Sequence, residues 1–440
     1  MIINNLMKIF LLIILLIEIG QSLLPVERYV HSSVLVEKRL FFFGGLSDHS
    51  PKPANSLDQI LYLDVSKPFN TVNPPFEEIP NTIPFGSSYA IAFPNSQKNV
   101  IYLFGGITVN VNTGLDDFKS ILYSYNLETN EWTIPITSEI APIRRREFSG
   151  VISNNTEKFY AFGGISDQII GTPNVIILND MNILDINSLT WSKGSTINAP
   201  LPRADFTATL LTNGIIVFIG GRETNALLDV DINQLVLYDT TIDKWSSMTA
   251  RGVILENRHA HSAVLTPDER IIIFGWCRCM NKTILNQLAV LNTKTYPYEW
   301  SIPQVSALNP APPPIQLHSA TLIGNYMFIN FGRNYQTPNP ELQKPYFYIL
   351  DIRNFTWVTQ FEPEQSPVTT NSIATVPIIN TSSANTSNST AEKAGQIGII
   401  LGAVSLSVVV VITVAGFLGY KFYIKKKYNS AIPTAGQIQT

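Results

Sequence analysis

Charge and cysteine are both scarce in this sequence. Lysine, arginine, aspartate and glutamate make up only 14% of its 440 residues, and 30 basic side chains are balanced by 33 acidic ones. This balance provides no basic patch for nucleic acid, so we expect no nucleic-acid partner. The two cysteines, Cys277 and Cys279, are separated by one residue. They leave three interpretations open: a strained disulfide, a pair of free thiols or a metal clip.

Histidine is scarce too, with only five in the chain. Two of them form His259-Ala-His261, and side chains at i and i+2 of an extended strand lie on one face, as in a metal pair. His261 also has the position that His31 and His318 have at the first strand of their own repeats. A repeated structural role is the simpler interpretation, so we predict no metal site and no cofactor.

The dominant feature of the sequence is an apolar strand that runs into glycine and occurs six times. The first glycines of the copies are Gly44, Gly105, Gly163, Gly220, Gly275 and Gly332, at intervals of 55 to 61 residues. An aromatic ring follows each of them by 25 to 32 residues, as Phe76, Trp132, Trp191, Trp245, Trp300 and Trp357. Self-similarity at a fixed period is typical of a repeat architecture in which each copy is one structural unit.

Each repeat also contains four short strand signals, bounded by asparagine, aspartate and glycine. In the first repeat they cover residues 31–36, 39–43, 59–65 and 76–79. The third strand of the later repeats covers residues 120–125, 182–186, 234–239, 288–292 and 348–352. A turn and the strand with the tryptophan follow it, which predicts four strands in every repeat.

This succession of strand, glycine pair, strand, turn and tryptophan resembles the kelch motif over about residues 26–361. The chain is similar to kelch-repeat propellers of the galactose oxidase type and, with the membrane span described below, to attractin-like membrane kelch proteins. The resemblance implies an all-β fold: a six-bladed kelch-type β-propeller with one four-stranded blade per repeat around a central channel. Glycine pairs permit close backbone approaches, and a large ring at a fixed point suits packing between blades.

Two repeats depart from the motif, and the ring has no evident clasp. The fifth reads Gly275-Trp276 and the sixth reads Gly332-Arg333, so we expect each to have lost its second glycine. Extra residues in the second and third repeats, at 109–117 and 168–179, are expected to form loops on one face. The repeats begin and end with whole blades, so we expect the first and last blades to close the ring by packing alone.

The two ends of the chain predict a single-pass membrane protein. Residues 1–22 contain a lysine, an apolar run and small residues, which are the parts of a cleaved signal peptide. Residues 394–420 carry no charge and are long enough for one transmembrane helix, and the lysines of the tail 421–440 place it in the cytoplasm. We therefore predict a plasma-membrane protein whose propeller, residues 23–362, is extracellular.

A segment rich in serine, threonine and asparagine, residues 363–393, predicts a disordered, glycosylated stalk between the propeller and the membrane helix. Six asparagines head glycosylation sequons: Asn154, Asn281, Asn354, Asn380, Asn385 and Asn388. Within the expected membrane helix, Gly398 and Gly402 permit close helix packing and so favour a homodimer.

Four arginines are the candidate ligand-binding residues. Arg28, Arg145, Arg203 and Arg258 precede the first strand of their repeats by one shared offset, where the second and sixth repeats have Phe85 and Ile315. The kelch resemblance implies that this position lies near the mouth of the central channel. The arginines either converge on the mouth as a receptor for carboxylate or sulfate groups, or hydrogen-bond local carbonyls and tie neighbouring blades together. Both roles remain open at this stage.

We predict a non-enzymatic module without catalytic residues, whose propeller binds an extracellular protein or glycan. The alternative is an extracellular carbohydrate-active enzyme or an oxidase of the galactose oxidase type. The resemblance implies that such an oxidase needs a copper held by tyrosine and histidine, and this chain has no Tyr-His dipeptide, the local pattern of that site. A structural adhesion protein is the third interpretation, and it differs from the first only in its partner.

Overall fold

The structure is a computed structural model that describes residues 23, 25–50, 53–80, 83–223, 227–275, 286–306, 311–334 and 347–364. Contacts divide the chain into two units, Met1–Ser366 and Pro367–Thr440, and every described residue belongs to the first. The expected signal peptide, membrane helix and tail, most of the stalk, both cysteines and Gly398 and Gly402 therefore lie outside the described residues. No helix in the described part of the chain has the length and apolar character needed to cross a membrane.

The described residues form six main sheets, one from each repeat, and contain no α-helix. The first strands of the sheets are β1 (Ser32–Val36), β7 (Ile91–Pro94), β12 (Ser149–Ser153), β19 (Thr207–Leu210), β26 (Ser262–Leu265) and β30 (Ser319–Ile323). The second strands are β2 (Arg39–Phe43), β8 (Val100–Phe104), β13 (Lys158–Phe162), β20 (Ile215–Ile219), β27 (Arg270–Phe274) and β31 (Tyr326–Asn330). The all-β prediction is confirmed for these residues.

The outer half of each sheet continues the same antiparallel order. The third strands are β3 (Ile60–Asp64), β10 (Leu122–Asn126), β16 (Met181–Asp185), β23 (Gln234–Asp239), β28 (Leu288–Asn292) and β32 (Phe347–Asp351). The fourth strands are β5 (Phe76–Glu78), β11 (Trp132–Thr133), β17 (Thr190–Lys193), β24 (Lys244–Thr249), β29 (Glu299–Ser301) and β33 (Thr356–Val358). In the fifth sheet, β25 (Arg251–Gly252) adds a parallel strand beside β29.

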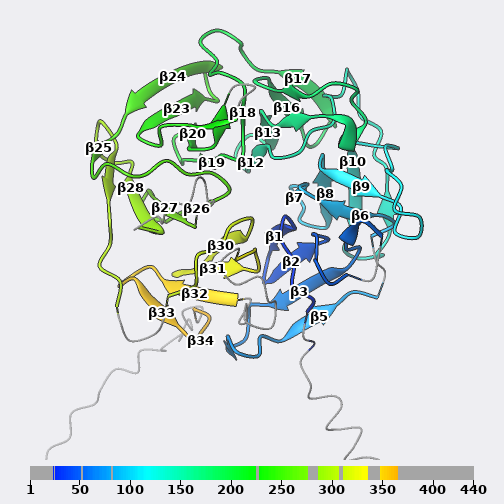
Figure 1. Cartoon of the computed structure of the whole chain (residues 1–440), viewed down its shortest axis with the longest axis horizontal. Coiled ribbons are helices and arrows are strands. Elements are labelled where there is room, and N and C mark those ends of the chain that lie inside the picture. Colours follow the sequence, from blue (N-terminus) through cyan, green and yellow to red (C-terminus); the bar gives the residue numbers. More distant parts are fainter. Residues whose placement is uncertain are drawn as a thin grey trace, which may run out of the picture. The chain divides into compact units, whose positions relative to one another are not determined.

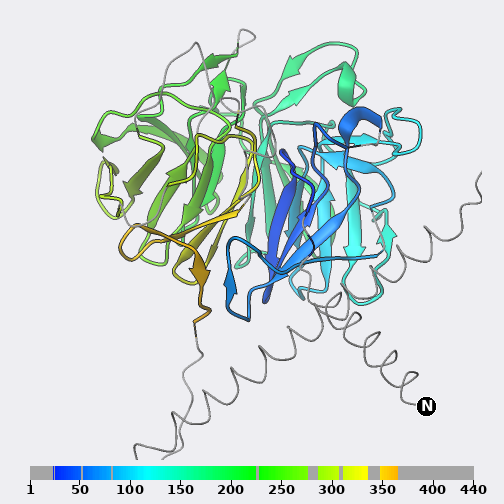
Figure 2. The same cartoon turned by 60° about the horizontal axis from the view of Figure 1, so that its bottom comes forward.

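The first strands contact one another in a closed series. β1 contacts β7, β7 contacts β12, β12 contacts β19, β19 contacts β26, β26 contacts β30, and β30 contacts β1. Figure 1 shows these six strands around the middle of the unit, with the later strands of each sheet farther out. Figure 2 shows the same sheets from another side, where the strands are seen along their length.

Glycine directly follows the second strand in the first five sheets, because the next sheet comes too close for a side chain. A Cβ on Gly163 would lie 2.5 Å from the carbonyl oxygen of Arg203 in the following repeat. The next residue, Gly164, donates its N–H to that same oxygen at 2.8 Å, and both glycines have positive φ. The equivalent bonds join Gly45 to Ser87, Gly106 to Arg145, Gly221 to Arg258 and Gly332 to Arg28. The glycine pair is therefore where one sheet is joined to the next.

The sixth repeat has lost its first glycine, not its second. Gly332 makes the backbone bond of a second glycine, to Arg28 O at 2.9 Å. The residue before it, Phe331, has a left-handed φ of 56°, and the Arg28 guanidinium lies 5.2 Å from the centre of its ring. The expectation from Gly332-Arg333 is therefore wrong, because aligning on the visible glycine shifted this repeat by one residue.

The aromatic ring of each fourth strand packs against the preceding repeat, as the motif predicts. Trp245 is buried with its ring centre 4.9 Å from that of Phe162, and its Nε1 donates to Ser195 O at 2.7 Å. In the first repeat Phe76 replaces the tryptophan, and its ring centre lies 5.6 Å from that of Phe331 in the sixth.

A short clasp joins the first and last repeats, which corrects the expectation of closure by packing alone. β4 (Phe69–Asn70) pairs antiparallel with β34 (Gln360–Phe361), and Thr71 donates its N–H to Thr359 O at 2.8 Å. The buried Phe361 ring lies 5.1 Å from that of Phe69. Strands of two residues are too short for a periodic pattern, so sequence analysis missed this pairing.

Three small sheets lie at the glycine end of the main sheets, where the long connections are. They are β6 (Gly86–Ser88) with β9 (Ile107–Val109), β14 (Ile165–Ser166) with β15 (Ile176–Ile177), and β18 (Arg203–Ala204) with β21 (Arg222–Glu223) and β22 (Leu228–Asp229). Each contains the residue that follows a glycine pair, so these connections surround one end of the channel. The expected loops of the second and third repeats are among them.

Candidate binding site at the channel mouth

One residue just before each first strand has a left-handed backbone. These residues are Val30, Tyr89, Glu147, Asp205, Ala260 and Leu317, with φ between 50° and 58°. Backbone N–H groups link them between repeats: Val30 to Leu317 O at 3.0 Å, Leu317 to Ala260 O at 3.2 Å, Ala260 to Asp205 O at 2.9 Å, Asp205 to Glu147 O at 2.8 Å and Tyr89 to Val30 O at 2.8 Å. A positive φ is uncommon without glycine, and these five hydrogen bonds between repeats explain its recurrence. We call these six residues the channel mouth.

A cavity of about 160 Å³ opens at the channel mouth. Its lining consists of the six mouth residues and of Ile91, His31, Ala90, Phe148, Phe206, His261 and His318. Burial lowers the pKa of His31 and His261 well below 6.5 and that of His318 to about 3, so all three are neutral near pH 7. Glu147 and Asp205 therefore supply the formal charge of the lining.

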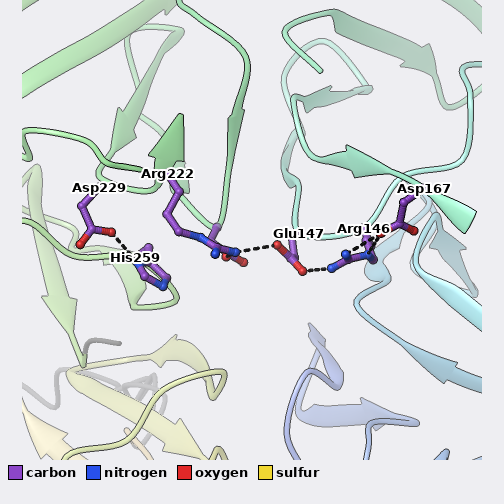
Figure 3. Close-up of polar contacts among 7 residues, drawn as sticks. Arg146, Glu147, Asp167, Arg222, Asp229 and His259 are labelled. Atoms are coloured by element: carbon purple, nitrogen blue, oxygen red, sulfur yellow. Dashed lines mark hydrogen bonds and ion pairs between the residues drawn. The ribbon is translucent and has the colours of Figure 1, made fainter. Parts of the chain in front are cut away.

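An ion-pair network runs around one side of the mouth (Figure 3). The Nη2 of Arg222 donates to Glu147 Oε2 at 2.9 Å and to Asp205 Oδ2, so one nitrogen joins the third repeat to the fourth. Arg146 donates to Asp167 Oδ2 at 2.6 Å and also pairs with Glu147. The side chains of Glu147 and Asp205 are 8% exposed each, so these charges are held in place at the rim of the cavity.

The two histidines of the His259-Ala-His261 pattern have separate partners. His259 Nδ1 lies 2.6 Å from Asp229 Oδ1 beside the ion-pair network (Figure 3). His261 Nε2 lies 3.2 Å from Thr207 Oγ1 of the preceding repeat. The left-handed Ala260 between them interrupts the alternation that would place both on one face. Among the described residues, no group of three histidine, cysteine, aspartate or glutamate side chains is arranged to hold a metal ion.

His261 repeats a contact that His31 and His318 also make. His31 Nε2 lies 2.8 Å from Ser319 Oγ, and His318 Nε2 lies 2.8 Å from Ser262 Oγ. Each pair joins a first strand to that of the preceding repeat. The repeated structural role is therefore what the geometry supports for these histidines.

The four arginines of the sequence analysis lie beneath the surface. Arg28, Arg145, Arg203 and Arg258 are exposed by 0%, 0%, 4% and 1%. The Nη1 of Arg28 donates to Gly44 O at 3.1 Å, that of Arg145 to Gly163 O at 3.1 Å, and that of Arg258 to Gln287 O at 3.3 Å. Each of these bonds goes to a local carbonyl in the same repeat. Ligand binding through the arginines stays a prediction.

Carboxylates also neutralise two of these arginines. Arg145 pairs with Asp180 at 2.7 Å, and Arg203 pairs with Glu223 at 3.1 Å. The offset needs a correction in the second repeat, where Ser87 has the arginine position in place of Phe85, since its carbonyl accepts the bond from Gly45 at 2.7 Å. Phe85 is instead buried against Tyr123, with ring centres 4.2 Å apart. 

Sequence analysis missed the charged residues that do line the mouth. The mouth residue follows the arginine position by two, which identifies Glu147 from Arg145 and Asp205 from Arg203. The shared arginine offset was therefore a usable signal for them. Arg222 directly follows a glycine pair, but nothing in its spacing indicates that it bridges two repeats.

Exposed apolar side chains gather on the connections of the second and third repeats. Leu115 is 69% exposed, Phe118 43%, Ile169 49%, Val175 69% and Ile176 42%. We call these five residues the apolar loops. The two connections meet, because β9 contacts η2 (Gln168–Ile170). Exposed apolar surface of this kind is typical of a protein-binding face.

The predicted glycosylation residues are only partly within the described chain. Asn154 and Asn354 lie in exposed turns between strands, and modification of them stays a prediction. Asn281, Asn380, Asn385 and Asn388 lie outside the described residues.

Comparison with models of protein families identifies the family of the chain. A model of the KLHDC2/KLHL20/DRC7 Kelch-repeats domain matches residues 18–221, 90–333 and 207–382, which together extend over more than half of the chain. The chain belongs to this kelch-repeat family. The resemblance on which the fold was predicted is thereby confirmed.

Individual relatives of this kelch protein match over part of their length. Kelch domain-containing protein 3 of Bos taurus is 26% identical over 270 residues, which cover 58% of this chain and 66% of that protein. Host cell factor 2 of Homo sapiens is 28% identical over 214 residues, or 45% of this chain and 25% of that protein. Acyl-CoA-binding domain-containing protein 4 of Arabidopsis thaliana is 24% identical over 249 residues, or 54% and 34%. The match thus spans just under two thirds of the first relative and less of the others.

The comparison also corrects the predicted plasma-membrane location. The relatives that were found are kelch domain-containing and host cell factor proteins rather than plasma-membrane proteins. The location rested on residues 1–22 and 394–420, and both ranges lie outside the described residues. On these relatives the prediction is wrong.

Proposed function

We propose that this kelch protein is a non-enzymatic protein-binding module, and that its six main sheets are the complete blades of one closed propeller. A segment of the partner enters the channel mouth, and the neighbouring surface of the partner covers the apolar loops. The observation that carries the proposal is a cavity of about 160 Å³ that residues of all six repeats line together, at the end of the main sheets where the exposed apolar loops also lie. Kelch family membership supports the same class of function.

The two parts of this surface suit different contributions to binding. Apolar side chains that become buried on binding supply about 25 cal/mol per Å² of area removed from water, so the apolar loops favour affinity. The mouth is small and its polar groups are fixed by hydrogen bonds, so it favours specificity for one side chain. A protein partner can reach both parts at once.

Blocking the mouth tests this function. Ala260→Tyr adds a ring at the mouth, and it is tolerable because Tyr89 has the same left-handed position in the second repeat. Ile242→Tyr is the matched control, on an exposed turn between β23 and β24, at the opposite end of the sheet. The assay is quantitative mass spectrometry of proteins retained by the immobilised full-length chain and by each variant.

The proposal expects one set of proteins that the parent chain and Ile242→Tyr retain and that Ala260→Tyr loses. Equal retention by all three chains would mean that partners bind elsewhere. Retention of glycans instead of proteins, measured on a glycan array with the same three chains, would replace the protein partner by a glycan.

A further inference from the structure

We propose that the channel mouth recognises a basic side chain, lysine or arginine, presented by the protein partner. This inference rests on the proposed function and names the chemistry of its ligand. It is the opposite of the anionic ligand that the arginine pattern predicted. The reason is the position of the charged groups at the mouth. The carboxylates of Glu147 and Asp205 line the cavity, whereas the four arginines of the sequence pattern are buried beneath it.

The chain itself shows what the mouth carboxylates bind. Glu147 Oε2 and Asp205 Oδ2 come from adjacent repeats and accept hydrogen bonds from the same guanidinium nitrogen, Nη2 of Arg222. Two carboxylates that converge on one nitrogen already have the geometry of a receptor for a cation, since such charge-assisted bonds are strong and directional. The backbone hydrogen bonds between repeats fix their spacing before any partner arrives.

Among the described residues, the ion-pair network at the mouth and the neighbouring Asp229–His259 pair contain more carboxylates than cationic groups. The network of Figure 3 contains the carboxylates of Glu147, Asp167, Asp205 and Asp229 against the guanidinium groups of Arg146 and Arg222, with His259 paired to Asp229. Of the residues that the structure describes, no lysine or arginine lines the cavity. A partner cation is therefore attracted to this opening, and the excess remains even if His259 is protonated.

The rest of the lining suits the aliphatic stem of such a side chain. Val30, Ala260 and Leu317 supply apolar surface from the first, fifth and sixth repeats, whereas the carboxylates come from the third and fourth. Lysine and arginine bury their methylene groups against apolar surface while their charged ends reach a polar partner. The mouth has both surfaces.

Carboxylates neutralise two of the four buried arginines of the sequence pattern. Arg145 is paired with Asp180 and Arg203 with Glu223, at 2.7 Å and 3.1 Å. Each pair is internal to its repeat and absent from the lining of the cavity. An anionic ligand would meet the carboxylates of Glu147 and Asp205 before it reached either guanidinium.

Selection from a display library of short random peptides, on the immobilised full-length chain, tests the inference without a known partner. We expect the enriched peptides to share a lysine or arginine, and replacing that residue by alanine to weaken binding about tenfold or more. Binding should also weaken as salt is raised, because opposite charges at a partly exposed site are screened. Free spermidine in the wash separates a general preference for cations from recognition of a peptide side chain.

Two variants of the network predict changes of opposite sign in the affinity of a selected peptide. Glu147→Gln removes one carboxylate and should weaken binding about tenfold. Arg222→Gln removes the internal cation that shares Glu147 and Asp205, and should tighten binding severalfold. Misfolding explains only a loss, so the gain is the decisive result. Asp268→Asn is the control, since this carboxylate pairs with an arginine on a turn outside the mouth.

The outcomes also separate this inference from the proposed function. If enriched peptides are acidic, or if Arg222→Gln does not tighten binding of a basic peptide, the basic-ligand inference is wrong. The proposed function survives that result when Ala260→Tyr still blocks the selected peptides. If Ala260→Tyr leaves binding unchanged, the mouth is not the binding site and both proposals fail.

Discussion

Replacing Gly220 by alanine tests how the sheets of this kelch protein are joined. Gly220 has a φ of +63°, and a Cβ there would lie 2.5 Å from the carbonyl oxygen of Arg258 in the next repeat. That oxygen also accepts the N–H of Gly221 at 3.0 Å. The substitution therefore strains the backbone and pushes apart a hydrogen-bonded contact between two sheets.

The expected loss of stability has two parts. A left-handed alanine costs about 1–2 kcal/mol, and weakening the bond to Arg258 adds about 1 kcal/mol, so the free energy of unfolding falls by about 2–3 kcal/mol. Gly214→Ala is the matched control. Its φ is +86°, but its Cβ would meet only the side chains of Thr240 and Thr241, at 3.2 Å and 3.1 Å. Gly214→Ala therefore loses stability only through the strain of its left-handed backbone.

Thermal unfolding followed by circular dichroism compares the two variants with the parent chain. Each kcal/mol lowers the Tm of a large domain by about 2–4 °C, so Gly220→Ala should melt at least about 2 °C below Gly214→Ala. Equal melting temperatures for the two variants would refute the reasoning. They would mean that glycine is required at position 220 for its backbone angle and not for contact with the next sheet.

Three further predictions concern closure, packing and pH. Phe361→Ala removes a buried ring from the clasp with Phe69 and should lower the free energy of unfolding by about 3–5 kcal/mol in urea denaturation. Trp245→Phe loses the hydrogen bond to Ser195 and part of the packing between repeats, which should lower the free energy of unfolding by about 1–3 kcal/mol in the same assay. An unchanged denaturation midpoint for either variant would contradict the packing described. Burial lowers the pKa of His318 to about 3. Between pH 6.5 and 3 only the unfolded chain binds this proton, so the free energy of unfolding falls as the pH is lowered from 6.5 to 3. His318→Gln should remove up to about 1.4 kcal/mol per pH unit from that slope, and an unchanged slope would contradict this account of His318.

The repeat sequence predicted the fold well because glycine and tryptophan are needed at the contacts between sheets. Gly163 has no space for a Cβ, and Trp245 fills the space beside Phe162. Such requirements recur once in every repeat and are therefore visible in one sequence. Phe331 shows the limit, since an aromatic residue in a left-handed position cannot be recognised as the counterpart of a glycine.

The site was harder to predict than the fold. The kelch resemblance implied that Arg145 and Arg203 lie close to the channel, but spacing does not tell whether a guanidinium faces the channel or a carbonyl. Arginine has five donors and serves either purpose. Glu147 and Asp205 occupy a position that is Val30 or Ala260 in other repeats, so no repeated residue type marked them.

Photo-cross-linking from the mouth tests the central claim most directly. A benzophenone amino acid at position 260 of the full-length chain lies on the cavity, and the same amino acid at position 242 lies on the turn at the other end of the sheets. If a segment of the partner enters the channel mouth, light should attach the partner to position 260 and not to position 242. Cross-links from position 242 alone, or from both positions equally, would contradict binding at the channel mouth.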